Sequence, residues 1–97
     1  MTGKQKRYLC ALAHPLRPVV NLGKQGLSQE TRREIEVQLL DHELIKLKVL
    51  DNCPLTKKEC ADELSRTKSL EVVQMIGKTL VLYCPHSDEP EIELPAT

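Results

Sequence analysis

The sequence lacks the features of a membrane or secreted protein. Among its 97 residues, no apolar run approaches the roughly 20 residues of a membrane span. The early basic residues Lys4, Lys6 and Arg7 are not followed by the apolar stretch of a secretion signal. Tryptophan and phenylalanine are absent and tyrosine occurs twice, so the core must be aliphatic. We expect a cytoplasmic protein with no membrane partner, folded as a single domain over residues 1–97.

Cysteine is present, but not in a pattern that predicts a metal site. The four cysteines show no CxxC spacing, and the three histidines are scattered along the chain. In a reducing compartment, such cysteines are expected to remain free thiols. The sequence therefore predicts no metal and no cofactor. The cysteines are Cys10, Cys53, Cys60 and Cys84.

Motifs of the common enzyme classes are also missing. Gly77-Lys78-Thr79 resembles the end of a P-loop, but Val72 stands where that motif needs its first glycine, and a strand is expected after the lysine. No serine lies in a nucleophile elbow, and there is no HExxH helix. The neighbouring side chains of His42 and Glu43 could act as an acid–base pair. A solvated histidine at a helix end is the commoner arrangement, and we expect no enzymatic activity.

The formal net charge is zero, but the two halves of the chain differ in sign. Residues 1–50 hold nine Lys or Arg against five Asp or Glu, and residues 51–97 hold five against nine. Five basic residues and no acidic residue precede Glu30. This asymmetry points to an anionic partner for the N-terminal half, although an ordinary solvated surface could carry it equally well.

Capping signals and hydrophobic patterns alternate between helix and strand along residues 2–84. Thr2 with Gln5, and Thr56 with Glu59, have the spacing of capping boxes, and Ser28 is a candidate N-cap. Strands are expected where apolar residues run together or alternate with polar ones. The sequence therefore predicts an α/β fold in the order αβαβαββ. Its helices end near residues 14, 42 and 68, and its strands lie at 18–22, 44–50, 72–76 and 79–83.

The sequence indicates the inner face of the first helix more clearly than that of the second. In the first helix, Tyr8, Leu9 and Leu12 share one face, which is the predicted inner face. The second helix has two candidate apolar pairs, and the sequence does not choose between them. These pairs are Ile35 with Leu39 and Val37 with Leu40.

The C-terminal end has a predicted hairpin followed by an acidic tail. Gly77-Lys78 suits a type II′ turn between the last two strands. Residues 85–97 then hold four acidic residues and no basic one. In this tail, the alternation of Ile92 and Leu94 predicts a weak edge strand.

The loop Gly23-Lys24-Gln25-Gly26 gives the strongest signal for a binding site. Two glycines three residues apart let another backbone approach closely. The helix that starts at Ser28 presents N–H groups and a positive dipole end, which together with Lys24 suit a phosphate. A GxxG loop clamps the nucleic-acid backbone in KH-type RNA-binding modules. The alternative is a tight turn that needs glycine for its conformation alone.

Six segments, in their order along residues 2–83, resemble the YhbY-type members of the CRM (chloroplast RNA splicing and ribosome maturation) family. They are Thr2–Gln5, Leu12–Leu16, Pro18–Val20, Gly23–Ser28, His42–Val49 and Ile76–Tyr83. The resemblance implies helices packed on a mixed four-stranded sheet, similar to the C-terminal domain of the third bacterial translation initiation factor. It also implies an RNA-binding protein, because known bacterial members associate with precursors of the large ribosomal subunit. The expected partner is therefore ribosomal RNA in pre-50S particles during ribosome assembly.

The resemblance and the charge pattern together give a set of candidate RNA-binding residues. The family's GxxG loop, implicated in RNA contact, falls on residues 23–26. Basic residues of the N-terminal third are expected to neutralise phosphates, whereas strand lysines could instead keep the sheet face hydrated. We expect the protein to act as a monomer. The candidates are Gly23, Lys24, Gln25, Gly26, Lys4, Lys6, Arg7, Arg17, Lys46, Lys48 and Lys78.

The sequence departs from the family pattern at two places. After Tyr83, relatives often have an arginine where this chain has Cys84, and the tail is acidic where many relatives are basic. Both departures imply a narrower positive surface and weaker RNA affinity. They leave open an alternative function, a protein-interaction adaptor on the ribosome or its precursors without direct RNA readout. His14 also has two interpretations, an RNA contact or the end of the first helix before Pro15.

Overall fold

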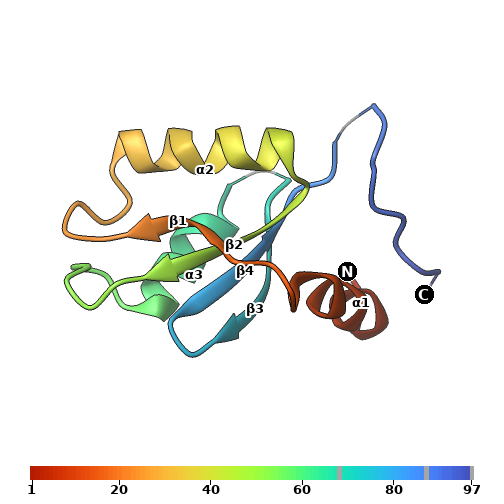
Figure 1. Ribbon diagram of the computed structural model, residues 1–97, viewed down its shortest axis with the longest axis horizontal. Helices are drawn as coiled ribbons and strands as arrows, with labels where there is room; N and C mark the ends of the chain where they lie inside the picture. The colour runs from red at the N-terminus through yellow and green to blue at the C-terminus, as the bar shows by residue number, and fades with distance from the viewer. Residues whose placement is uncertain (68, 87, 97) are drawn as a thin grey trace.

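Three helices and four strands follow one another in the predicted order αβαβαββ (Figure 1). The computed structural model describes residues 1–67, 69–86 and 88–96. The elements are α1 (Gly3–Ala13), β1 (Pro18–Leu22), α2 (Gln29–Asp41), β2 (Leu44–Val49), α3 (Lys57–Ser65), β3 (Glu71–Ile76) and β4 (Thr79–Tyr83). The predicted α/β fold class is confirmed. The expected end of the third helix, near residue 68, lies outside the described residues, and α3 ends at Ser65. No helix in the described ranges is both long enough and apolar enough to cross a membrane.

The predicted capping boxes set the starts of α1 and α3. Thr2 Oγ1 accepts a hydrogen bond from Gln5 N at 3.2 Å, and Thr2 N donates to Gln5 Oε1 at 3.1 Å. Thr56 and Glu59 make the same reciprocal pair at 3.1 and 2.9 Å. Each pair satisfies backbone N–H groups that the first turn of a helix leaves without partners. Both capping boxes are therefore confirmed.

The strands form one mixed sheet in the order β1-β2-β4-β3. β1 and β2 run parallel and are joined through α2, whereas β4 is antiparallel to both β2 and β3. In the turn between β3 and β4, Gly77 alone of the two turn residues has a positive φ, +55°. This is the backbone pattern of the predicted type II′ turn. Because β4 follows Lys78 directly, these residues have no P-loop geometry.

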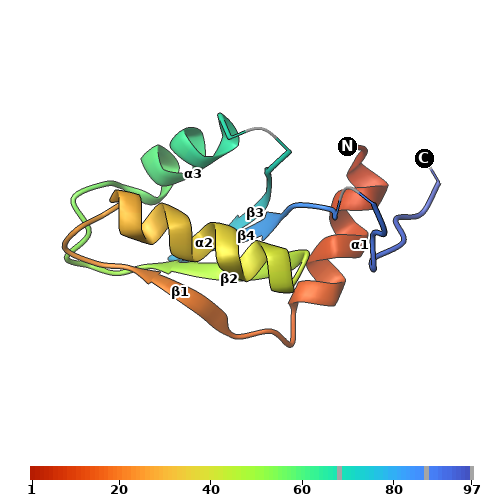
Figure 2. The same cartoon turned by 90° about the horizontal axis from the view of Figure 1, so that it is seen from above.

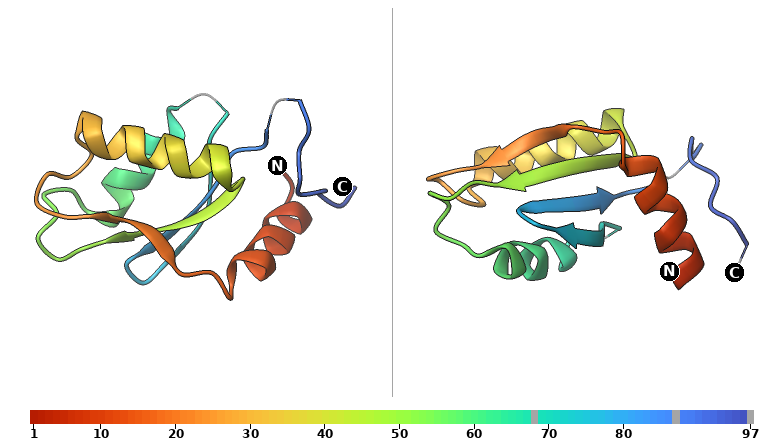
Figure 3. Two further views of the ribbon diagram at one scale, coloured as in Figure 1. Left: turned by 45° about the horizontal axis from the view of Figure 1, so that its top comes forward. Right: turned by 60° about the horizontal axis from the view of Figure 1, so that its bottom comes forward.

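The two faces of the sheet are covered unequally. α2 and α3 cover one face, where the inward side chains of all four strands meet the helices. On the other face, α1 lies across one end of the sheet, and Leu9 and Ala13 pack against Val81 and Tyr83. Figures 2 and 3 show α1 at this end, apart from the other two helices. The larger core contains Val20, Leu22, Ile35, Leu39, Ile45, Leu47, Val49, Cys60, Ala61, Leu64, Leu70, Leu80 and Leu82.

The structure decides which apolar pair of α2 faces the core. Ile35 and Leu39 are buried, with exposed fractions of 2% and 5%. Val37 and Leu40 are 48% and 67% exposed. The pair four residues apart on the inner stripe therefore packs on the sheet, and the second pair remains on the surface.

The predicted inner face of α1 was partly wrong. Leu9 is fully buried as expected, but Tyr8 and Leu12 are 40% and 39% exposed. The second buried position is Ala13, one turn after Leu9. Because α1 covers only the end of the sheet, a narrow stripe spaced by four residues is enough to make this contact.

The predicted edge strand in the tail was wrong. Residues 85, 86 and 88–96 contain no strand, although Ile92 and Leu94 do pack against the smaller core beside α1. The backbone N–H groups of His86, Glu91 and Ile92 each donate to the carboxylate of Glu43 at 2.7 Å. The backbone of the tail is therefore held by the buried carboxylate of Glu43. The backbone N–H groups that an edge strand would use already have this carboxylate as their acceptor.

Candidate nucleic-acid interface

The glycine loop is a tight turn between β1 and α2. Gly26 N donates a hydrogen bond to Gly23 O at 2.9 Å, which closes a four-residue turn. Lys24 and Gln25 occupy its two central positions and are exposed. Ser28 then caps α2, because its Oγ accepts a backbone N–H of the first helical turn at 3.2 Å. The two polar side chains are thus exposed, and the turn between β1 and α2 lies at one end of the molecule (Figure 1).

The two glycines of this turn differ in what the backbone requires. Gly26 has a φ of +58°, and a Cβ at this position would lie 3.2 Å from Pro54 Cγ. Gly23 has no positive φ, and its Cβ would make an ordinary contact of 3.5 Å with Asn52 Oδ1. Gly26 is therefore required by the turn itself, whereas Gly23 has room for a methyl group.

This difference predicts opposite tolerance to alanine. We expect Gly26→Ala to lower the free energy of unfolding by about 1–2 kcal/mol, because it forces an L-residue into the left-handed region. Gly23→Ala should be neutral or stabilise by up to about 1 kcal/mol, because it restricts the unfolded chain. Urea unfolding of both variants measures the difference. Equal unfolding midpoints would contradict the assigned turn geometry.

The loops after β1 and β2 lie together, opposite the α1 end of the molecule (Figures 1 and 2). Leu50 N donates to Leu22 O at 2.8 Å, which continues the parallel pairing of the two strands into their loops. The β3–β4 turn joins them, since Val49 N donates to Lys78 O at 2.7 Å. Three loops, 23–28, 50–56 and 77–78, therefore form one surface, the loop end.

Sequence reasoning missed Lys57 at the loop end. This side chain is in the first turn of α3 and, with Lys78, lines a hollow of about 290 Å³. A signal was available, because the carboxyl ends of parallel strands meet at one edge of a sheet. The helices that follow β1 and β2 both begin at that edge. The N-terminus of α3 had to lie close to the glycine turn.

The candidate residues fall into two groups at opposite ends of the sheet. The molecule is 39 Å along its longest axis, which is horizontal in Figure 1. One group lies on α1 and beside it, and the other lies at the loop end. The α1 group is Lys4, Lys6, Arg7, Arg17 and Lys46, and the loop group is Gly23, Lys24, Gln25, Gly26, Lys48 and Lys78. The structure therefore does not bring all candidates into one compact site.

An open part of the sheet connects the two groups. Lys46 and Lys48 point to the face on which α1 packs, because side chains alternate along β2 and Ile45, Leu47 and Val49 face α2 and α3. Lys48 is paired across the sheet with Asn21 and Thr79, and Thr79 is paired with Ile76, which is 54% exposed. This open face is therefore basic, with some exposed apolar surface, and leads from α1 to the loop end.

Two candidate lysines are already bound within the protein. Lys46 Nζ donates to the carbonyl of His14, the C-cap residue of α1, at 3.2 Å. Lys78 forms an ion pair with the carboxylate of Asp51. The hydrogen bond and the charge of Lys78 lower the pKa of Asp51. The charge of Lys78 is thus compensated, while Lys46 holds the end of α1 against the sheet.

Lys24 and Lys48 form no ion pair with any residue that the structure describes. They are also exposed. At the start of α2, Glu30 already places a negative charge on the first turn, where the helix dipole favours one. These two lysines therefore contribute more positive charge to the loop end than the N-terminus of α2 does.

The neighbouring His42 and Glu43 do not form an acid–base site. Glu43 is 2% exposed and its carboxylate is committed to the tail backbone. Burial opposes its ionisation, but the hydrogen bonds from the backbone of His86, Ile92 and Glu91 outweigh burial and lower the pKa of Glu43. Its role is to hold the tail.

The cysteines are free thiols. Burial is the main cause that raises the pKa of Cys60 to about 12, and the neighbouring Cys53 adds to it. A thiol with such a pKa is unreactive at neutral pH. Within residues 1–67, 69–86 and 88–96, no three His, Cys, Asp or Glu side chains are grouped so that they could hold a metal ion.

Taken together, the fold and the site define a small α/β domain with a GxxG turn at one edge of a mixed sheet and a basic open face. The chain belongs to the CRS1 / YhbY (CRM) domain family, whose model matches residues 1–83. This confirms the family inferred from the sequence motifs.

Individual relatives cover nearly the whole chain. The Bacillus subtilis protein named "Probable RNA-binding protein YqeI" is 41% identical over 95 residues, which is 98% of this chain and 99% of the relative. A Haemophilus influenzae protein named "RNA-binding protein" is 45% identical over 95 residues, 98% of this chain and 95% of the relative. The solution structure of the hypothetical protein SAV1595 from Staphylococcus aureus is also similar. It has a TM-score of 0.78 and 41% identity, and the match covers 98% of this chain and 99% of that one.

Proposed function

We propose that this protein binds RNA through the loop end and the open sheet face, with the α1 group extending the contact. The RNA is ribosomal RNA in precursors of the large ribosomal subunit. The protein is a single domain that acts in the cytoplasm as a monomer, by binding and without catalysis. The observation that carries this proposal is the exposed Lys24 in the GxxG turn, with Lys48 on the neighbouring strand, neither of which forms an ion pair with a described residue. The chain also belongs to a family whose relatives are named RNA-binding proteins. The ribosomal partner follows from the family resemblance described above.

The composition of the surface favours contact with the RNA backbone. Proteins that bind single strands through their bases use exposed aromatic side chains as stacking platforms. This chain has two aromatic residues, and Tyr83 is buried with 3% of its surface exposed. Tyr8, on α1, is the one left for stacking. The energy of binding should therefore come mainly from phosphate contacts, and binding should weaken strongly with added salt.

The loop lysine gives the direct test of this proposal. We expect Lys24→Ala to remove about one phosphate contact, which lowers the salt slope of log affinity by roughly 0.7 on single-stranded RNA. The substitution leaves both glycines and the turn in place. Fluorescence anisotropy with a fragment of large-subunit ribosomal RNA, measured over a range of salt concentrations, gives the slope.

Arg66→Ala provides the matched control. Arg66 is exposed at the C-cap of α3, the end of this helix away from the glycine turn, and α3 covers the opposite face of the sheet. Its removal makes the same change in net charge and should leave the slope unchanged. If Lys24→Ala melts like the parent and keeps the parental affinity and slope, Lys24 is not part of an RNA site.

A further inference from the structure

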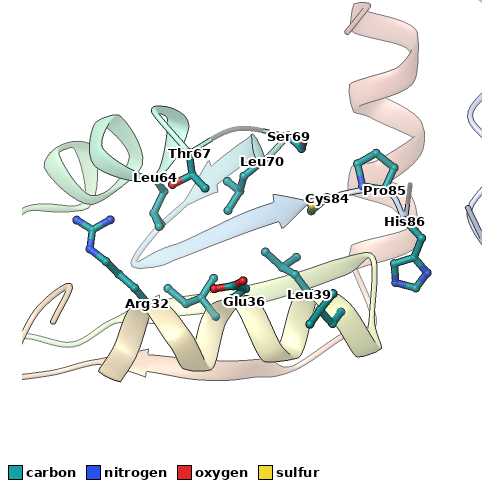
Figure 4. A pocket seen from close by; sticks show the side chains of 12 residues that line it. Arg32, Glu36, Leu39, Leu64, Thr67, Ser69, Leu70, Cys84, Pro85 and His86 are labelled. Carbon is teal, nitrogen blue, oxygen red and sulfur yellow. The ribbon is translucent and has the colours of Figure 1, made fainter. Parts of the chain in front are cut away.

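A groove between α2 and α3 lies on the face of the molecule away from the open sheet face. Figure 4 shows Leu39 on one wall, Leu64 and Leu70 on the other, and Cys84 at the back. The cavity has a volume of about 540 Å³. Its floor is the larger hydrophobic core, whose side chains are buried there, and Leu40 adds an exposed apolar side chain.

One end of the groove carries negative charge. Glu36 stands on the α2 wall, and a second hollow beyond Leu40 is lined by Asp88, Glu89 and Glu91 of the tail. Leu40, which is 67% exposed, and His86 line both hollows, so the two hollows are adjacent. The result is an apolar groove that opens onto an acidic surface.

The one basic side chain among the groove-lining residues is already paired. Arg32 Nη2 lies 3.5 Å from Glu63 Oε2, and Arg32 Nε donates to Leu27 O at 3.1 Å. Its charge is therefore offset at the far end of the groove. The carboxylates at the other end form no ion pair with any described residue.

His86 adds a polar group without a partner where the two hollows meet. Its Nε2 is buried and makes no hydrogen bond within the described part of the structure. Its backbone N–H donates to Glu43 at 2.7 Å, which ties this segment to the body of the protein. A buried polar nitrogen without a hydrogen-bond partner is unfavourable.

We propose that this groove binds a basic amphipathic helical segment of a partner protein. Apolar side chains on one face of that helix would fill the groove between α2 and α3, as in other helix-in-groove complexes. Its Lys or Arg side chains would lie against Glu36 and the acidic residues of the tail. RNA is excluded as the occupant by the same carboxylates, because they repel phosphate. The site is independent of the proposed RNA surface, since the two lie on opposite faces of the sheet.

A synthetic peptide tests this proposal on the full chain. The probe is a helical peptide of about 15 residues. It has leucines at every third or fourth position and lysines elsewhere. We expect it to cause saturable NMR shifts at Leu39, Leu64 and Leu70. A second peptide, in which glutamates replace the lysines, should cause none. Shifts centred on the open sheet face, equal binding of both peptides, or no saturable binding would overturn the proposal.

Two variants and one control locate the binding site. Leu40→Ser should weaken binding of the lysine peptide about tenfold, because it removes one apolar contact. The double change Asp88→Lys and Glu89→Lys should weaken it about threefold or more. Val37→Ser is the matched control, because Val37 is exposed on α2 but does not line the groove. It should change binding by less than about twofold.

Analytical sedimentation of the protein without peptide tests whether a second copy of this chain occupies the groove instead. The proposal expects the mass of one chain across the concentration range. Self-association that Leu40→Ser abolishes and Val37→Ser does not would assign the groove to a second copy, and would overturn binding of a partner helix.

Discussion

Glu43→Ala is expected to release the C-terminal tail and to lower the free energy of unfolding by about 2–3 kcal/mol. The parental carboxylate is 2% exposed and accepts three backbone hydrogen bonds from the tail, each 2.7 Å long. Hydrogen bonds to a charged acceptor are stronger than neutral ones, and alanine leaves all three donors without it. Urea unfolding gives the stability. Amide hydrogen exchange at Glu91 and Ile92 reports release of the tail.

The contribution of Glu43 should also disappear in acid. Its pKa in the folded protein is below the ordinary value of 4.5, because the backbone hydrogen bonds outweigh the effect of burial. A carboxylate with a lowered pKa stabilises the fold fully above its unfolded pKa, and this stabilisation is lost as the pH falls through its folded pKa. The difference in stability between the parent and Glu43→Ala should therefore be largest near neutral pH and shrink below pH 4.5.

Glu34→Ala is the control for this experiment. Glu34 is an exposed carboxylate on α2, and its replacement should change stability by no more than about 0.5 kcal/mol. Parental stability and unchanged exchange at Glu91 and Ile92 in Glu43→Ala would show that the carboxylate does not hold the tail.

Much of the fold could be predicted because its signals are local. The reciprocal pairs Thr2 with Gln5 and Thr56 with Glu59 each lie within one helical turn, so the sequence alone places two helix starts. The same holds for the alternation along β2, where Lys46 and Lys48 face away from the larger core. Such features require no knowledge of distant residues.

The path of the tail could not be predicted, because it depends on a contact across more than 40 residues. Ile92 and Leu94 alternate like a strand, but the backbone donors beside them bind Glu43. Nothing in the sequence near residue 92 specifies that acceptor. The inner face of α1 was missed for a related reason, since only packing at the end of the sheet decides that Ala13 is buried and Tyr8 is not.

The residues of the candidate site could be predicted from the sequence, but their arrangement in space could not. The spacing of Gly23 and Gly26 identified the turn, and the structure shows that only Gly26 has the positive φ. Nothing in the sequence distinguishes the lysines that form an ion pair or hydrogen bond within the protein from those that do not. The ion pair of Lys78 with Asp51 joins residues far apart in the chain and becomes visible only when the loops come together.

The largest effect on RNA binding is expected from reversing the two unpaired charges. Lys24→Glu combined with Lys48→Glu should weaken binding to a large-subunit ribosomal RNA fragment by about 100-fold at low salt and lower the salt slope by roughly 1.4. Each substitution removes a phosphate contact and adds a repulsive charge. Both side chains are exposed and form no ion pair with a described residue, so the fold should be retained. Anisotropy titrations over a range of salt concentrations measure both quantities.

Arg33→Glu combined with Arg66→Glu separates a located site from the effect of net charge. These exposed residues lie on α2 and at the C-cap of α3, the two helices that cover the other face of the sheet, and their reversal changes the net charge by the same amount. A diffuse attraction would weaken equally in both double variants, because it depends on total charge. If the RNA binds at the loop end, the loss of affinity should be at least about tenfold greater for the Lys24 and Lys48 variant. Of the two pairs, only Lys24 and Lys48 would then contact phosphate. Equal losses in two variants that melt like the parent would mean that net charge attracts the RNA and that the loop end is not its binding site.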